Sequence, residues 1–163
     1  MDDTVDDPKF ASERWRDLDM LLTRTGRLVG ENFEPNTELR QLLQSEDCRV
    51  LCVGAGGLGC EILKDLALTG FVNIDVIDMD TIDVSNLNRQ FLFRMKDVGQ
   101  PKATVAAERI NLRVPGARVT PHFGRIEEQP ADWYRSFAII ILGLDSLEAR
   151  RYMNSVVCGF LGA

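Results

Sequence analysis

Apolar and polar positions along residues 49–80 follow a pattern that predicts a strand, a turn, a helix and a second strand. Residues 49–53 (RVLCV) form a short apolar, β-branched run, as expected of a buried parallel strand. Residues 60–69 carry apolar side chains at helical spacing, and Gly70 stands where a left-handed C-terminal cap belongs. Residues 73–78 then predict a second strand that ends in a carboxylate.

The predicted turn is rich in glycine and reads GAGGLG. Glycine permits a tight turn at the first position, close approach of the backbone to a phosphate in the middle, and close packing of the helix on the strand at the last. The N-terminus of the helix then offers unpaired N–H groups and the positive end of a dipole to an anion. Asp78 follows Gly59 by 19 residues (78 − 59), near the ~20 typical of a carboxylate that binds ribose. The pattern predicts a nucleotide site, and the alternative is a glycine-rich turn that binds nothing. Its residues are Gly54, Gly56, Gly57, Gly59 and Asp78.

The rest of the chain continues the alternation of strands and helices. We expect strands over 118–123 and 137–142, helices over 102–113 and 147–160, and a polar segment or short helix over 127–136. This order predicts a Rossmann-like, doubly wound α/β fold with a mainly parallel sheet and right-handed crossovers. The most apolar strand, 137–142, is expected at the centre of that sheet. The helix over 102–113 is expected to supply core residues Val105, Ala106, Ile110 and Leu112.

Two parts are predicted along the chain. Residues 1–47 form an acidic start and a helical arm, with helices over 10–25 and 36–44, and residues 48–163 form the nucleotide-binding part. The first helix carries an apolar stripe that either packs on the domain or meets a partner subunit. The stripe consists of Trp15, Leu18, Leu21 and Leu22.

Composition narrows the class of protein. The 163 residues are 45% hydrophobic and 27% charged, with a net charge of −6, which argues against nucleic acid as the main partner. No signal peptide or membrane-spanning run is evident, and the cysteine pattern suits a reducing compartment, so we expect the cytoplasm and nucleus. The sole histidine, His122, has no evident partner for general-base work. None of the four cysteines (Cys48, Cys52, Cys60 and Cys158) shows metal-ligand spacing. Cys52 lies in the predicted strand and Cys60 in the predicted helix, so we expect core thiols.

A second segment changes the interpretation from a dinucleotide to ATP. The loop over 78–90 reads DMDTIDVSNLNRQ, and GQPKA follows over 99–103. Together with GAGGLG, these segments resemble the adenylation domain of ubiquitin-like-modifier-activating enzymes and their bacterial sulfur-carrier relatives. The resemblance extends from Trp15 onward, and TPHF over 120–123 and GLDS over 143–146 resemble the branch that activates modifiers of the Nedd/Rub type.

The resemblance implies ATP-dependent activation of a modifier's C-terminal glycine, together with a regulatory subunit. The modifier's carboxylate would attack the α-phosphate of ATP and release pyrophosphate. A carboxylate is already ionised at pH 7, so the step requires positioning and cations rather than a general base. The implied roles are catalytic cations at Arg89 and Lys102, a Mg²⁺ ligand at Asp145, ribose binding at Asp78, and phosphate or ribose contacts at Asn86 and Gln90, with Asp80 as a further candidate.

Several alternatives stay open. The family's later strands, zinc-binding cysteine pairs, thioester cysteine domain and ubiquitin-fold domain have no counterpart in this sequence, so we expect an incomplete adenylation domain with an unpaired strand edge, and assign no thioester cysteine. A truncated fragment that binds nucleotide or partner without catalysis, or a NAD-dependent oxidoreductase, are the competing functions. Each proposed site residue also has an alternative, purely structural role. These are a surface ion pair with Asp80 or Asp83 for Arg89, a solvated helix position for Lys102, and a helix N-cap for Asp145.

Overall fold

A computed structural model describes residues 8–24, 27, 29–30, 32–34 and 38–160, with side chains from Trp15 onward. Its centre is a four-stranded parallel sheet in the order β3-β2-β1-β4. The strands are β1 (Val50–Val53), β2 (Asn73–Asp78), β3 (Arg118–Phe123) and β4 (Ile139–Leu142).

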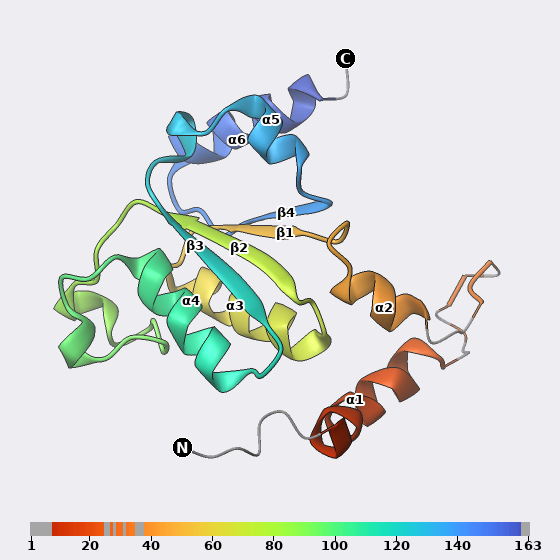
Figure 1. The fold of residues 1–163 in the computed structure, drawn as a ribbon. Coiled ribbons are helices and arrows are strands. Elements are labelled where there is room, and N and C mark those ends of the chain that lie inside the picture. The colour runs from red at the N-terminus through yellow and green to blue at the C-terminus, as the bar shows by residue number, and fades with distance from the viewer. Residues whose placement is uncertain (1–7, 25–26, 28, 31, 35–37, 161–163) are drawn as a thin grey trace.

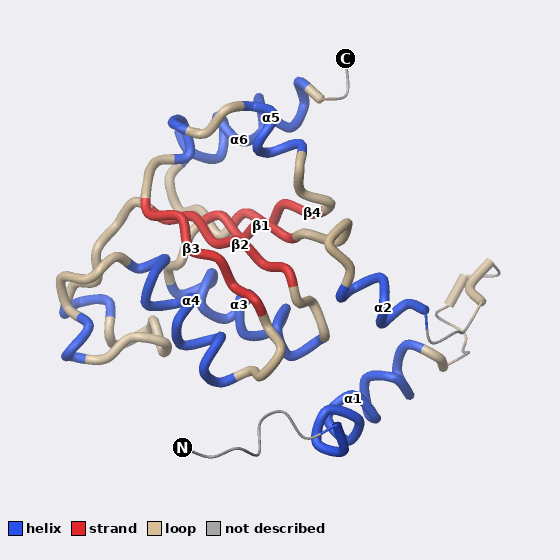
Figure 2. The backbone as a smooth tube through the Cα atoms, in the orientation of Figure 1, coloured by secondary structure: helices blue, strands red, loops and turns tan. Residues whose placement is uncertain are grey.

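Helices cover both faces of the sheet, as Figure 1 shows. On one face lie α3 and α4, on the other α5 and α6, while α1 and α2 stand beside the sheet as an arm (Figures 1 and 2). Single 3₁₀ turns occur over Val84–Asn86, Met95–Asp97 and Ile126–Glu128. The helices are α1 (Pro8–Leu22), α2 (Glu38–Gln44), α3 (Gly57–Thr69), α4 (Lys102–Arg113), α5 (Ala131–Arg135) and α6 (Leu147–Gly159).

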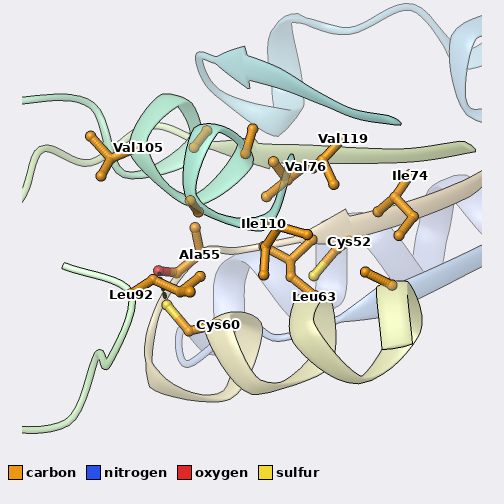
Figure 3. Close-up of a cluster of buried hydrophobic side chains, with 14 of the residues drawn as sticks. Cys52, Ala55, Cys60, Leu63, Ile74, Val76, Leu92, Val105, Ile110 and Val119 are labelled. Carbon is orange, nitrogen blue, oxygen red and sulfur yellow. Dashed lines mark hydrogen bonds between the residues drawn. The ribbon is translucent and has the colours of Figure 1, made fainter. Parts of the chain in front are cut away.

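Each face of the sheet has its own apolar core, because both faces are covered. The core under α3 and α4 includes Cys52, Leu63 and Ile110, which meet between the helices and the strands in Figure 3. The core under α5 and α6 includes Leu51, Tyr134 and Met153. This three-layer arrangement confirms the predicted doubly wound α/β fold.

Two details of the predicted fold are wrong. The strand expected at the centre of the sheet, β4, lies at its edge, because among the described residues it pairs only with β1. Leu112 was expected in the core but is 79% exposed. It lies two residues beyond the buried Ile110, about 200° further round the helix, and so faces away from the sheet.

The outer side of β4 borders an apolar groove. The groove has a volume of about 920 Å³ and runs between β4 and α6. Ile139 and Leu142 of β4 are each 39% exposed, which fits the expected unpaired edge. Among the lining residues are Ile140, Leu142, Leu144, Met153, Val157 and Phe160.

The N-terminal arm packs on the domain through part of its predicted stripe. A Cβ atom added at Gly70 would lie 2.8 Å from Leu18 and 3.2 Å from Trp15, so these side chains rest on the C-terminal cap of α3. Gly70 has the expected left-handed conformation, with φ of 109°. Leu21 is 66% exposed and does not share this contact.

Some predictions about the arm lie outside the described residues, including those for residues 1–7 and the start of the second helix at 36–37. None of the described helices combines the length and the apolar character needed to cross a membrane.

Candidate functional site

The carboxyl ends of three strands meet at the glycine loop. The backbone N–H of Gly54 donates to the carbonyl of Ile77 at the end of β2, at 2.8 Å. The N–H of Gly143, just after β4, donates to the carbonyl of Val53 at the end of β1, also at 2.8 Å. The topology therefore assembles the loop at the edge where ligands bind in open parallel sheets.

Two glycines of this loop are required by its geometry. Gly54 has φ of +99°, and a Cβ atom there would also lie 2.9 Å from the carbonyl oxygen of Gly143. At Gly59, a Cβ atom would lie 1.9 Å from the carbonyl oxygen of Gly54, so α3 packs directly on the turn. Both roles predicted from the sequence, the tight turn and the close packing, are thus present.

The start of α3 is open toward solvent. Gly56 is the N-cap of α3, and apart from Gly56 and its chain neighbours no heavy atom of the described residues lies within 4 Å of the position that a Cβ would take. The first N–H groups of a helix lack intrahelical acceptors, and the dipole adds positive charge there. The backbone of Arg89 lies beside this turn, its carbonyl oxygen 3.5 Å from a Cβ built at Gly57. The arrangement can hold an anion such as a phosphate.

Asp78 closes the loop from the end of β2. One carboxylate oxygen accepts the N–H of Ala55 at 2.6 Å, and the other accepts the N–H of Asp80 at 2.8 Å. Burial raises the pKa of Asp78 above its usual value, while these two hydrogen bonds and the charge of Lys102 oppose the rise. Asp78 therefore fixes the glycine loop in addition to any contact that it makes with a ribose.

Lys102 is buried, which rules out the alternative of a solvated helix position. Its side chain is 9% exposed, and its Nζ lies 2.8 Å from a carboxylate oxygen of Asp80, whose side chain is 55% exposed. The same two residues also bond through the backbone, since the N–H of Lys102 donates to the carbonyl of Asp80 at 2.9 Å. A buried ammonium group held at the edge of the site is a suitable partner for phosphate oxygens.

The loop between β2 and α4 is stabilised by hydrogen bonds from side chains to the backbone. Asp83 and Asn86 form a capping box around the turn Val84–Asn86, in which the N–H of Asp83 donates to the amide oxygen of Asn86 at 2.9 Å. Arg89 is exposed and donates to the carbonyl of Ser85 at 2.9 Å, so the alternative ion pairs with Asp80 and Asp83 are not formed.

Gln90 is the unusual member of this loop. The residue is only 3% exposed, and its Oε1 atom has no hydrogen-bond partner among the described residues. An unpaired buried polar atom costs about 1–3 kcal/mol, so most buried polar atoms have a hydrogen-bond partner. The orphaned amide fits the expectation that Gln90 contacts a ligand.

Asp145 lies in the turn between β4 and α6. The residue is exposed, and the N-cap of α6 is its neighbour Ser146, whose Oγ accepts the N–H of Ala149 at 3.3 Å. The suggested N-cap role of Asp145 is therefore wrong. Gly143, two residues before it, contacts the glycine loop, so the structure brings Asp145 to the same edge of the sheet as Asp78.

Sequence reasoning missed a polar cluster on the face of the sheet that α5 covers. Asp75 of β2 is 4% exposed and accepts hydrogen bonds from Arg49, at 3.0 and 3.1 Å, and from His122, at 2.7 Å. His122 also meets the edge of Trp133 at 5.1 Å between ring centroids. The signal was an aspartate at a core position of a predicted strand, which requires a charged partner. The cluster joins β2 and β3 to Arg49, the residue just before β1, and lies among the side chains under α5.

The cysteines do not offer a reactive thiol at the site. Burial raises the pKa of both Cys52 and Cys60 to about 12, and Cys60 donates to the carbonyl of Ala55 (Figure 3). Both are core thiols, as predicted. Among the described residues, no group of three or more His, Cys, Asp or Glu side chains is placed to hold a metal ion.

A parallel sheet with a glycine loop, a buried lysine and two carboxylates at its carboxyl edge is typical of nucleotide-binding α/β domains. The model of the ThiF family matches residues 29–162, and the chain belongs to this family. The NEDD8-activating enzyme E1 catalytic subunit of Arabidopsis thaliana is 57% identical over 94% of this chain, and that of Dictyostelium discoideum is 56% identical over 96%. The chain spans about a third (34–35%) of the length of these curated relatives.

Solved structures show the same fold. The E. coli tRNA N6-threonylcarbamoyladenosine dehydratase TcdA superposes with a TM-score of 0.67 at 29% identity, covering 87% of this chain and 54% of TcdA. Its complex with ATP has a TM-score of 0.61 at 33% identity, covering 83% of this chain and 51% of TcdA.

Proposed function

We propose that this chain is the nucleotide-binding part of an adenylation domain that activates a NEDD8-type ubiquitin-like modifier with ATP. The observation that carries the proposal is the open glycine loop at the start of α3, bordered by Asp78 and the buried Lys102. The similarity to NEDD8-activating E1 catalytic subunits supports the choice of modifier, and the fold shared with the ATP complex of TcdA supports the choice of nucleotide.

The proposed reaction is attack of the modifier's C-terminal carboxylate on the α-phosphate of ATP. An acyl-adenylate forms, the bond to the β-phosphate breaks, and pyrophosphate leaves. In this proposal Arg89 and Lys102 stabilise the phosphate charge, and the N–H groups at the start of α3 hold the phosphate chain. Asp78 binds the ribose, with Asn86, Gln90 and Asp80 as further contacts.

Magnesium belongs to the proposal through Asp145. Mg²⁺ usually takes one or two carboxylates and completes its shell with phosphate oxygens and water, so a single exposed carboxylate at the sheet edge fits it. The ion would neutralise charge on the phosphates, and Asp145 would orient it.

The partners follow from the relatives and are likewise proposed. They are a regulatory subunit of the activating enzyme, which completes the site, and the NEDD8-type modifier itself, in the cytoplasm and nucleus. A thioester step is not assigned to this chain. The competing proposal is a fragment that keeps nucleotide or partner binding without catalysis.

The test begins with isothermal titration of the 163-residue chain with Mg-ATP, with NADH as the competing ligand. We expect ATP to bind and NADH not to bind, and Lys102→Ala to weaken ATP binding about tenfold or more because a charge-assisted contact is lost. Tight binding of NADH without ATP would refute the proposal in favour of an oxidoreductase.

Catalysis is tested separately by ATP–pyrophosphate exchange in the presence of a regulatory subunit and NEDD8-type modifier. Exchange that depends on the modifier supports the adenylation reaction. ATP binding without exchange supports the non-catalytic fragment.

A further inference from the structure

Lys102 is positioned by the backbone around it. It is the first residue of α4, and its N–H bonds to the carbonyl of Asp80. Just before it, the N–H of Ile82 donates to the carbonyl of Gln100 at 2.9 Å, and the N–H of Gly99 donates to the carbonyl of Ile82 at 2.8 Å. The segment over 99–102 is thus bonded to the segment over 80–82, which follows β2 directly.

The loop that leads into this segment is held by a partly buried ion pair. Asp97 is 4% exposed, and its carboxylate accepts the N–H of Arg94 at 2.8 Å. Both of its oxygens also accept from the guanidinium of Arg109, each at 3.1 Å. The carbonyl of Asp97 accepts the N–H of Gln100 at 3.0 Å. Asp97 therefore joins the turn Met95–Asp97 to the flank of α4.

The ion pair closes a loop of chain that contains Lys102. Arg109 lies seven residues after Lys102, about two turns along α4, whereas Asp97 lies five residues before it. The pair therefore fixes how the first turn of α4 meets the loop before it. Gly99, with φ of +88°, gives that loop a sharp bend immediately before the helix. The pair adds a side-chain link between the loop before α4 and the second turn of that helix, and its loss removes this restraint on the bend and on the start of α4.

We propose that Asp97 and Arg109 form a positioning pair for Lys102, and that they set how well the site recognises the phosphates of its nucleotide. This inference rests on the proposed function, since it takes the nucleotide to be ATP. Neither residue touches the ligand. They act through the backbone that places the Lys102 ammonium group at the sheet edge.

The proposal makes a specific distinction between parts of the ligand. Lys102 forms an ion pair with Asp80 and is the proposed phosphate partner, whereas Asp78 at the end of β2 is the proposed ribose partner. The ion pair restrains the start of α4 but not the end of β2. Its loss should therefore weaken ATP binding and leave adenosine binding unchanged.

The experiment compares ATP and adenosine affinities of the 163-residue chain by isothermal titration. The main variant is Arg109→Leu. The Arg109 side chain is 30% exposed and borders a surface pocket of about 290 Å³, so replacing it with the shorter leucine leaves no enclosed cavity in the core. The expected result is about threefold to tenfold weaker ATP binding, a smaller loss than the one expected from removing the Lys102 charge itself, with adenosine affinity unchanged.

The controls separate positioning from general damage. Glu108→Gln removes a charge from an exposed neighbour on the same helix and should change neither affinity. Arg109→Lys keeps the cation and should recover part of the ATP affinity. Asp97→Asn should resemble Arg109→Leu, and the double variant should be no worse than either, because both remove one interaction. Amide hydrogen exchange gives a readout without ligand, in which Ile82 and Lys102 should exchange faster.

Each contrary result has its own meaning. If the wild-type chain does not bind ATP, both this proposal and the proposed function are overturned. If it binds ATP but Arg109→Leu leaves the ratio of ATP to adenosine affinity unchanged, only the positioning pair is overturned. An equal loss for both ligands also overturns it, since that pattern indicates a purely structural role.

Discussion

The contact between Gly59 and the glycine loop gives the sharpest test of how the site is built. Replacing Gly59 with alanine adds one methyl group to the first turn of α3. The structure leaves 1.9 Å between that Cβ atom and the carbonyl oxygen of Gly54, and 2.8 Å to the carbonyl carbon. The first distance is 1.5 Å short of the 3.4 Å at which ordinary contact begins.

The strain cannot be relieved by a side chain, because the atoms in the way are backbone. Either α3 moves away from the sheet, or the loop at Gly54 opens. Overpacking a tight contact usually costs about 1–3 kcal/mol, and this contact lies at the upper end because of its depth. Alanine recovers up to about 1 kcal/mol through better helix propensity. We therefore expect Gly59→Ala to lower the free energy of unfolding by about 2 kcal/mol net.

A matched control exists two residues away. Gly57 is in the same helix, but a Cβ atom there would lie 3.5 Å from its nearest neighbour, the carbonyl oxygen of Arg89, which is an ordinary contact. Gly57→Ala should therefore be neutral or stabilise the fold by up to about 1 kcal/mol. Urea denaturation followed by circular dichroism measures both variants. Equal unfolding midpoints for the two variants would refute the reasoning that α3 packs on the turn through Gly59.

Three further predictions concern other parts of the molecule. At pH 8, Ellman's reagent should react rapidly with the exposed Cys158 and slowly with the three buried thiols. Burial raises the pKa of Cys52 and Cys60 to about 12 and so keeps these thiols protonated, and a rapid phase that persists in Cys158→Ser would contradict the prediction. Ile139→Lys on the outer strand should reduce light scattering on concentration, with unfolding changed by less than about 0.5 kcal/mol, and unchanged scattering would show that the β4 edge does not drive association. Asp145→Ala should abolish the Mg²⁺ dependence of ATP affinity, whereas Glu148→Gln should retain it; a retained dependence in Asp145→Ala removes that residue from the site.

Local patterns were sufficient to predict most elements of the fold. The range expected for β2, 73–78, matches the observed strand, and the predicted cap at Gly70 has the left-handed conformation. The period of apolar residues and the need for a positive φ both depend on residues that are close in the chain, so they can be predicted from the sequence alone.

The spatial neighbours of a strand or of a side chain could not be predicted from the sequence in this way. The run over 137–142 is apolar enough for a central strand, yet β4 lies at the edge of the described sheet, because strand order depends on which chain segments pair with it. The burial of Lys102 was likewise not predicted. It arises because Asp80, 22 residues earlier, folds back against the start of α4.

The sequence by itself determined that a glycine loop, a strand-end carboxylate and a helix N-terminus would lie together, because all three are set by spacing within residues 49–80, and it predicted a nucleotide site there. Only the tertiary structure decided which distant side chains complete it. It buried Lys102 against Asp80, left Oε1 of Gln90 without a partner among the described residues, and joined Asp97 to Arg109. Contacts of this kind require that loops be closed by the packing of the whole sheet, and no local periodicity encodes them.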